Sequence, residues 1–163
     1  MRTEPLNYNI DHVDFIDKHG EELEKGIIHE EDISDIFDMI LEMAISDIIS
    51  VKSNLTNLYM HLLKYQYRFD YQTRSWVNTI RRCNFDLDET ISQSKALSRK
   101  ITPELQKLAY DKAKKYASSE TNLDIQRFPE ECPYDIDFVL DKDKIENFLW
   151  LYAYTDEVKQ LLS

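Results

Sequence analysis

A long series of apolar residues dominates the pattern of this sequence between positions 37 and 65. Residues spaced three and four apart share one face of an α-helix, and a sustained repeat of this kind buries a seam against neighbouring helices. We therefore predict one long helix over about residues 32–67 with this whole stripe in the core. The members of the stripe are Phe37, Leu41, Ala44, Ile48, Val51, Leu55, Leu58, Leu62 and Tyr65.

Polar residues cluster inside this stretch at positions 46–53, where Ser, Asp and Asn could interrupt a helix. The apolar repeat continues across them without a change of phase, which argues against a sharp break. On the N-terminal side, Asp11 can cap a shorter helix that ends at about residue 25. Gly26 suits the position just after that end, because glycine readily adopts the left-handed backbone conformation found there.

Further helices are predicted on the C-terminal side of the long one. Thr102 followed by Pro103 is a start signal, because threonine caps a helix and proline suits its first turn. Two prolines, Pro129 and Pro133, define a stiff loop that excludes a helix interior. A core face on the first of these helices consists of Trp76, Ile80, Cys83, Leu87 and Ile91. The predicted helices cover residues 75–97, 103–121, 136–140 and 142–162.

Composition supports helices rather than sheets. The chain of 163 residues contains only 2 Gly and 4 Pro, so the turn residues that join tight β-hairpins are scarce. A hydrophobic fraction of 42% is typical of a globular protein, and this length suits one domain. We predict an all-α fold: a single helical domain over residues 1–163, a bundle built around one long central helix, with an added C-terminal helix.

Several protein classes are disfavoured by the same sequence. The longest uncharged apolar run, residues 148–154, is far shorter than the roughly 20 residues of a membrane span. No apolar segment follows the first residues, so no signal peptide is expected. Cys83 and Cys132 are too few for a disulfide framework and lack metal-ligand spacing, and we expect free thiols. These features predict a cytoplasmic protein without membrane contact.

Charge is distributed unevenly along the chain. The net charge is −11, with 14 acidic and 3 basic side chains in residues 1–50. Residues 51–119 carry 13 basic and 6 acidic side chains, whereas residues 120–163 carry 11 acidic and 4 basic ones. Either the acidic ends pair internally with the basic middle, or separate faces of opposite charge engage partners.

A basic and aromatic segment stands out at residues 61–82. His61 and Lys64 are three positions apart and share a helix face. Arg74, Asn78 and Arg81 share a stripe on the next helix. Basic residues interleaved with aromatic ones suit phosphates and stacked bases. The candidate functional cluster is His61, Lys64, Arg74, Trp76, Asn78, Arg81, Glu130 and Glu131.

The two glutamates enter this cluster as a counter-charge or lid. Glu130 and Glu131 lie between the prolines of the loop and could pair with Arg74 or Arg81 as an internal contact. His61 could be a general base or phosphate-facing group beside Lys64, or it could simply bond a neighbouring helix at the edge of the core.

Signals for catalysis or metal binding are absent from the sequence. It contains no Glu-x-x-His or His-x-x-x-His pair, no Gly-x-Ser-x-Gly motif and no glycine-rich phosphate loop. Nothing in the spacing requires a Cys132–His61 pair. We predict no metal and no cofactor, catalytic residues remain unknown, and an enzyme is the less favoured class.

Several strings in the chain together carry a family resemblance: residues 14–15 with Gly26, MHLLKYQY at 60–67, RSW and TIR within 74–81, Glu120-Thr121, and FPEECPY at 128–134. They resemble the bacterial family catalogued as domain of unknown function 29. The resemblance covers about residues 14–140 and implies an all-helical fold, with no activity that can be transferred. Residues 142–163 extend beyond it, and we expect this helix to dock on the bundle or on a second chain through Phe148, Leu149, Trp150 and Tyr152.

Two functions follow as hypotheses. The first is a non-catalytic protein-interaction module whose acidic surface engages a basic protein partner, with a homo-oligomer as a further form of assembly. The alternative is a nucleic-acid-binding or nuclease-like protein that uses the basic and aromatic segment 61–82.

Overall fold

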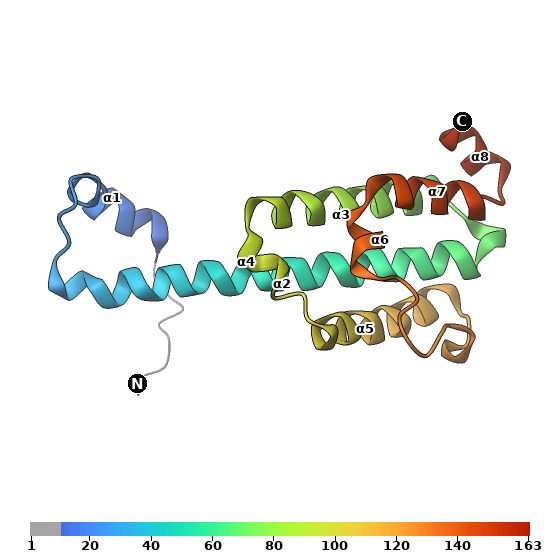
Figure 1. Cartoon of the computed structure of the whole chain (residues 1–163), viewed down its shortest axis with the longest axis horizontal. Coiled ribbons are helices and arrows are strands. Elements are labelled where there is room, and N and C mark those ends of the chain that lie inside the picture. Colours follow the sequence, from blue (N-terminus) through green and yellow to red (C-terminus); the bar gives the residue numbers. More distant parts are fainter. Residues whose placement is uncertain (1–10) are drawn as a thin grey trace. The chain divides into compact units, whose positions relative to one another are not determined.

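The computed structural model describes residues 11–163, and every regular element in this range is an α-helix or a short 3-10 helix (Figure 1). The all-α prediction is confirmed. The chain forms two compact units, one ending at Ile48 and the other covering Ile49–Ser163, and each is described separately. The long helix α2 (Ile33–Tyr67) contributes residues to both units. None of the helices in the described range combines the length and the apolar character that a bilayer span requires.

The described part of the N-terminal unit consists of α1 (His12–Glu24), a 3-10 helix (Glu30–Asp32) and the beginning of α2. The Asp11 carboxylate accepts hydrogen bonds from the backbone N–H groups of Val13 and Asp14 at 3.1 and 3.0 Å, as expected of an N-cap. Gly26 follows the C-cap with a backbone φ of 75°, a value that residues with a Cβ rarely adopt. Both predicted signals for this helix are therefore confirmed.

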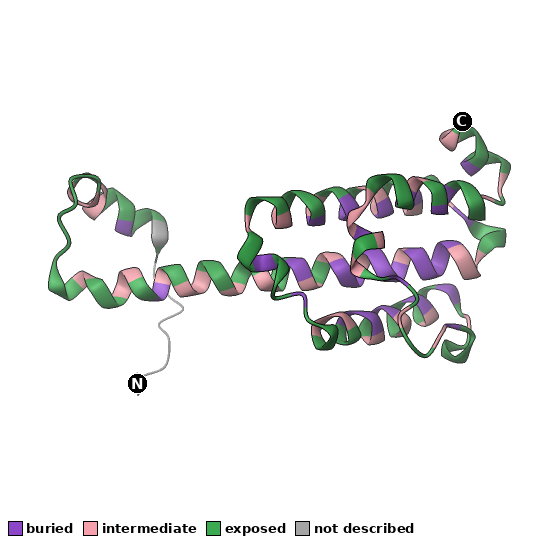
Figure 2. Ribbon diagram, viewed as in Figure 1, coloured by how far each residue is buried: buried purple, intermediate pink, exposed green. Residues whose placement is uncertain are grey.

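The apolar stripe of α2 is buried only along its second part. Val51 is 2% exposed, and the rest of the stripe as far as Tyr65 is fully buried. By contrast, Phe37 is 56% exposed and Ala44 is exposed. Figure 2 shows this change along α2, which is mainly purple in its second part and mainly green and pink in its first. The prediction that the whole stripe lies in the core is therefore wrong for its first part, because no described helix covers that face there.

In the second unit, helices surround the buried part of α2. Figure 1 shows α3 and α7 on one side of this helix and α5 on the other. A 3-10 turn at Phe69–Tyr71 leads into α3, and another at Ile125–Arg127 follows α5. The helices of this unit after α2 are α3 (Arg74–Gln93), α4 (Lys95–Ser98), α5 (Pro103–Thr121), α6 (Ile136–Leu140), α7 (Lys142–Tyr152) and α8 (Asp156–Leu162).

Two of the predicted helices are interrupted. The helix predicted over 75–97 divides at Ser94, whose extended backbone ends α3 and whose hydroxyl accepts from the Leu97 N–H to cap α4. The helix predicted over 142–162 divides after Tyr152, and the Thr155 hydroxyl accepts from the Val158 N–H to cap α8. Serine and threonine caps of this kind offer the backbone an alternative to a continuous helix.

Helix α7 docks on the bundle with one face only. Phe148 and Leu149 are buried at 9% and 0% exposure, and the Tyr65 hydroxyl donates to the Leu149 carbonyl oxygen at 2.6 Å. Trp150 and Tyr152 on the same helix remain exposed. The expected docking on the bundle is therefore confirmed for the first pair of residues.

Gln72, in the loop before α3, joins three parts of this unit. Its amide nitrogen donates to the carbonyl oxygens of Tyr65 and Tyr152 at 2.9 and 2.6 Å, and its amide oxygen accepts from the N–H groups of Tyr154 and Thr155 at 2.8 and 3.4 Å. The side chain is 4% exposed. One buried amide thus satisfies backbone groups at the ends of α2 and α7 and before α8, which water could not reach easily.

We predict that Gln72→Ala lowers the free energy of unfolding of the second unit by about 2–4 kcal/mol, because several buried backbone groups lose their partner. Urea denaturation followed by circular dichroism measures this change. Gln126→Ala is the matched control, because Gln126 is exposed and should change stability by less than about 0.5 kcal/mol. Equal stability of the two variants would contradict the assigned role of Gln72.

Candidate functional site

The structure distributes the candidate residues over three places in the second unit. Lys64 is brought together with Trp76, Arg81 faces α7, and the two glutamates lie on the loop that follows α5. Arg74 and Asn78 are exposed on α3. Their functional roles stay predictions.

The first place is a buried lysine enclosed by three helices. The Lys64 ammonium is 4.6 Å from the centroid of the Trp76 ring and forms an ion pair with the Glu120 carboxylate of α5. The side chain of Lys64 is only 6% exposed, whereas that of Glu120 is 49% exposed. A buried cation needs such a counter-charge, and a nearby aromatic face adds a further attraction.

A small hollow of about 170 Å³ opens beside this ion pair and is lined by Arg68, Tyr71, Trp76, Glu120 and Thr121. The Tyr71 and Trp76 rings pack edge to face, with 6.0 Å between their centroids. The Lys64 ammonium is paired with Glu120 of α5 and lies beside Trp76 of α3. These contacts link α2, α3 and α5.

His61 lies half-buried on α2 one turn before Lys64. Its Nδ1 is 2.9 Å from the carbonyl oxygen of Asn57. Burial lowers the pKa of His61 from its ordinary value, and the nearby Lys64 charge acts in the same direction. The contact with Asn57 opposes this shift but does not cancel it. The net lowering keeps the ring neutral at neutral pH.

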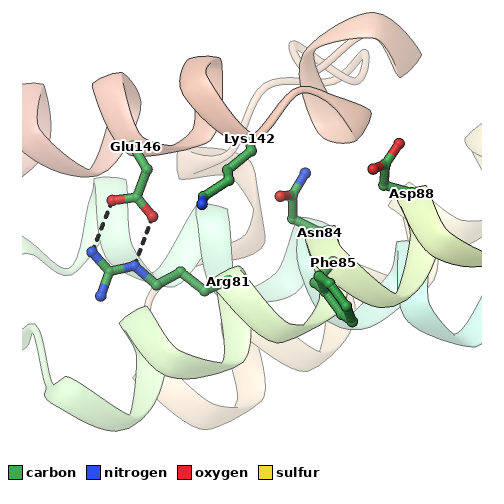
Figure 3. A pocket seen from close by; sticks show the side chains of 6 residues that line it. All are labelled: Arg81, Asn84, Phe85, Asp88, Lys142 and Glu146. Carbon is green, nitrogen blue, oxygen red and sulfur yellow. Dashed lines mark hydrogen bonds and ion pairs between the residues drawn. The ribbon is translucent and has the colours of Figure 1, made fainter.

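The second place is a cleft between α3 and α7. Figure 3 shows the side chains of Arg81 and Glu146 directed at each other, with Lys142 beside them. The Arg81 Nε donates to Glu146 Oε1 at 2.7 Å and its Nη2 donates to Glu146 Oε2 at 2.8 Å, a bidentate pair. Arg81 therefore pairs with Glu146 of α7, not with Glu130 or Glu131 as predicted.

This cleft has a volume of about 530 Å³ and is lined by Arg81, Asn84, Phe85, Asp88, Lys142 and Glu146 (Figure 3). Asn84 is 4% exposed, and its amide nitrogen donates to the Val139 carbonyl oxygen at 2.7 Å. The polar groups at this end of the cleft thus fasten α3 to α6 and α7.

The third place is the proline-containing loop. Glu130 and Glu131 are exposed and line a hollow of about 660 Å³ together with residues of α5. The Lys114 ammonium donates to the backbone carbonyl oxygen of Glu130 at 3.0 Å, and the Tyr110 hydroxyl donates to that of Pro129 at 2.8 Å. The loop is thus fixed against α5.

Cys132, in the same loop, is not activated as a nucleophile. Its thiol donates to the carbonyl oxygen of Tyr134 at 3.3 Å, and burial raises the pKa of the thiol. A raised pKa reduces the thiolate fraction at neutral pH. Among the described residues, no group of three or more His, Cys, Asp or Glu side chains is arranged to hold a metal ion.

Sequence reasoning missed three residues that organise these places: Gln72, Glu120 and Glu146. Glu120 was part of a family-like string, so its presence was a usable signal. Gln72 and Glu146 carried no signal, because a polar residue in a loop or on a helix surface is usually solvated.

The fold and these internal polar links define an all-α helical protein without a recognisable catalytic constellation among the residues described. The family comparison matches residues 7–145 to the family described as Domain of unknown function DUF29. The chain therefore belongs to this family, and the matched range includes residues of both units. Neither the curated proteins nor the solved structures yielded a match to the chain.

We predict that Glu120→Gln lowers the free energy of unfolding by about 1–3 kcal/mol, because it leaves the buried Lys64 ammonium without a counter-charge. The partial exposure of Glu120 keeps the loss below that of a fully buried pair. Adding Lys64→Met to Glu120→Gln should recover most of this stability. A urea-denaturation double-mutant cycle measures the coupling, and additive losses would contradict the pairing.

We also predict a pH effect from His61. Well above pH 6.5, the ordinary pKa of histidine, the ring is neutral in both states and contributes no pH dependence. As the pH falls below this value, the unfolded chain takes up a proton that the buried ring resists, so stability decreases. His61→Gln should flatten the slope of unfolding free energy with pH as the pH falls through and below about 6.5. An unchanged slope in the variant would contradict the lowered pKa.

Proposed function

We propose that this protein is a non-catalytic interaction module whose acidic N-terminal unit binds a basic protein partner. The observation that carries the proposal is charge: residues 11–48 contain 13 Asp and Glu side chains against 2 Lys, a net of −11. A concentrated negative field of this kind attracts a positively charged partner and speeds its association.

Among the residues that the structure describes, a few contacts offset part of this charge. The Lys18 ammonium pairs with Asp14 at 2.5 Å, and His29 contacts Glu22 at 2.9 Å. The acidic side chains at positions 17, 21, 24, 30 and 31 are exposed. Exposed carboxylates in this number are well suited to steer a basic surface toward the unit.

Internal pairing with the basic middle of the chain was the alternative for this acidic unit. Two of those basic residues are paired with other carboxylates. Lys64 pairs with Glu120, and Arg81 pairs with Glu146. Both acidic partners lie in the second unit. This pairing favours an external partner for the N-terminal unit over internal neutralisation.

The same pairing weakens the nucleic-acid alternative. Of the cations proposed for phosphate contact, Lys64 is buried and Arg81 is held by a bidentate carboxylate. Arg74 and Arg82 remain exposed on α3. Arg68, whose side chain is 39% exposed, is the third remaining arginine. Three arginines give a smaller basic footprint than the whole segment would.

We propose a bacterial cytoplasm as the setting of this interaction. The bacterial part rests on the resemblance of the sequence to its family. Cys83 and Cys132 are both free thiols. Free cysteines are typical of a reducing compartment, which supports the cytoplasmic part.

We predict that neutralising three exposed acidic residues of α1 abolishes partner capture. The variant carries Asp17→Asn, Glu21→Gln and Glu24→Gln, which remove charge and keep the size of the side chains. The wild-type chain should retain basic proteins from the native host at about 50 mM salt and release them at about 0.5 M, because salt screens exposed charges. Mass spectrometry and nucleic-acid staining identify what is bound.

A matched control variant carries Glu89→Gln, Asp137→Asn and Glu157→Gln, three exposed acidic residues of the second unit. It has the same change in net charge and should bind as the wild-type chain does. Equal loss in both variants would show only a general charge effect. Retention of RNA or DNA without protein would favour the nucleic-acid alternative instead.

A further inference from the structure

An unusual number of large apolar residues is exposed in the N-terminal unit, and those on α2 form one stripe. Among monomeric soluble proteins, contiguous exposed apolar patches are rare and mark interaction surfaces. The exposed large apolar residues in the described part of this unit are Val13, Ile16, Ile27, Ile28, Ile33, Phe37, Ile40 and Met43. We call Ile33, Phe37, Ile40 and Met43 the α2 stripe, with exposures of 54%, 56%, 62% and 63%.

The α2 stripe continues a face of the helix that forms core further along the chain. Steps of seven residues keep nearly the same helix face. Phe37 and Ala44 are exposed, whereas Val51, Leu58 and Tyr65, at successive steps of seven, are 2%, 0% and 0% exposed. The same face therefore carries apolar residues suited to helix packing in both parts of α2, but only the second part is covered.

Burial at Phe37 and Asp38 on α2 is the reverse of that in an ordinary surface helix. Such a helix buries its apolar face and exposes its charged residues. Here Asp38 is 1% exposed, while the neighbouring Phe37 is 56% exposed. An exposed apolar face beside a buried polar one is the arrangement expected of a helix whose apolar face is covered by another molecule.

Acidic groups lie at both ends of the α2 stripe. Glu30 and Glu31 are exposed just before α2 begins, and Asp47 is exposed beyond Met43. A hollow of about 360 Å³ next to the stripe is lined by Glu42, Met43, Ser46 and Asp47. A lysine or arginine side chain of a bound segment could place its aliphatic stem on Met43 and its charge near Asp47.

We propose that the α2 stripe binds an amphipathic helix of another protein, with apolar residues spaced three and four apart and Lys or Arg along its flanks. This inference rests on the proposed function and specifies the partner. A helix fits because the stripe has the repeat with which helices pack side by side. Charge complementarity selects the partner, because a second copy of this chain would bring another unit with a net charge of −11 against the first.

The test uses the full chain and a synthetic helical peptide of about 18 residues, long enough to follow the stripe. The basic peptide has Leu at the repeat positions and Lys on the flanks. A second peptide replaces the Lys residues by Glu, and a third has the composition of the first in scrambled order. Fluorescence anisotropy measures the Kd of each, and the basic peptide should bind at least about tenfold more tightly than the other two.

Phe37→Gln with Ile40→Gln should weaken binding of the basic peptide by about tenfold to hundredfold, because both side chains lie at the centre of the stripe. Glutamine retains a good helix propensity, so α2 should remain intact, which circular dichroism verifies. The control is Trp150→Gln with Leu151→Gln, which removes two exposed apolar residues of the second unit (72% and 68% exposed) and should leave the Kd unchanged.

Other outcomes would overturn the inference in distinguishable ways. Equal binding of the scrambled peptide, or an unchanged Kd for the Phe37 and Ile40 variant, would exclude the stripe as the site. The proposed function would still stand if the acidic α1 variant lost its captured partner. A dimer in sedimentation analysis that Phe37→Gln with Ile40→Gln dissociates would instead assign the stripe to a second copy of the chain.

Discussion

Burial of one face of α2 between Val51 and Tyr65 is the constraint on which the second unit depends. Each large apolar side chain removed from water there contributes about 1.5–3 kcal/mol, and the residues of this face are almost fully buried. The helices α3, α5 and α7 surround this part of α2. The positions of all other groups in the unit follow from how these helices are held against it.

A small set of buried and partly buried polar links fixes those helices in place. Gln72 joins the ends of α2 and α7, Lys64 joins α2 to α5 through Glu120, and Arg81 joins α3 to α7 through Glu146. Such groups cost free energy when they are buried without partners, so their partners must be in position. Lys64 and Arg81, two basic residues of the candidate cluster, are members of these links.

The N-terminal unit is organised differently. Its exposed apolar stripe is unusual for an isolated surface. The stripe and the negative charge together support the proposed binding of a basic amphipathic helix. The structural links lie in the second unit and the proposed recognition surface lies in the first. Most of the family-like strings lie in the second unit.

Much of the fold could be predicted from local patterns. Asp11, Thr102 and Gly26 mark helix ends because capping is a short-range interaction between a side chain and the backbone beside it. The breaks at Ser94 and after Tyr152 were missed. A single serine does not by itself end a helix, and the backbone at the second break is bonded by Gln72, about 80 residues away in the sequence.

The candidate site was less predictable than the fold. Proximity in sequence grouped Lys64 with Arg81, but the structure directs them to carboxylates on different helices, Glu120 and Glu146. Pairing over such separations depends on how helices pack, and no local spacing encodes it.

The sequence by itself determined the helices, most of their ends, the family and the separation of charge along the chain. These properties follow from short-range backbone preferences and from composition. Only the tertiary structure decided which part of the apolar stripe is covered. An apolar repeat specifies that a helix face avoids water, but the molecule that covers that face depends on which other helices lie beside it.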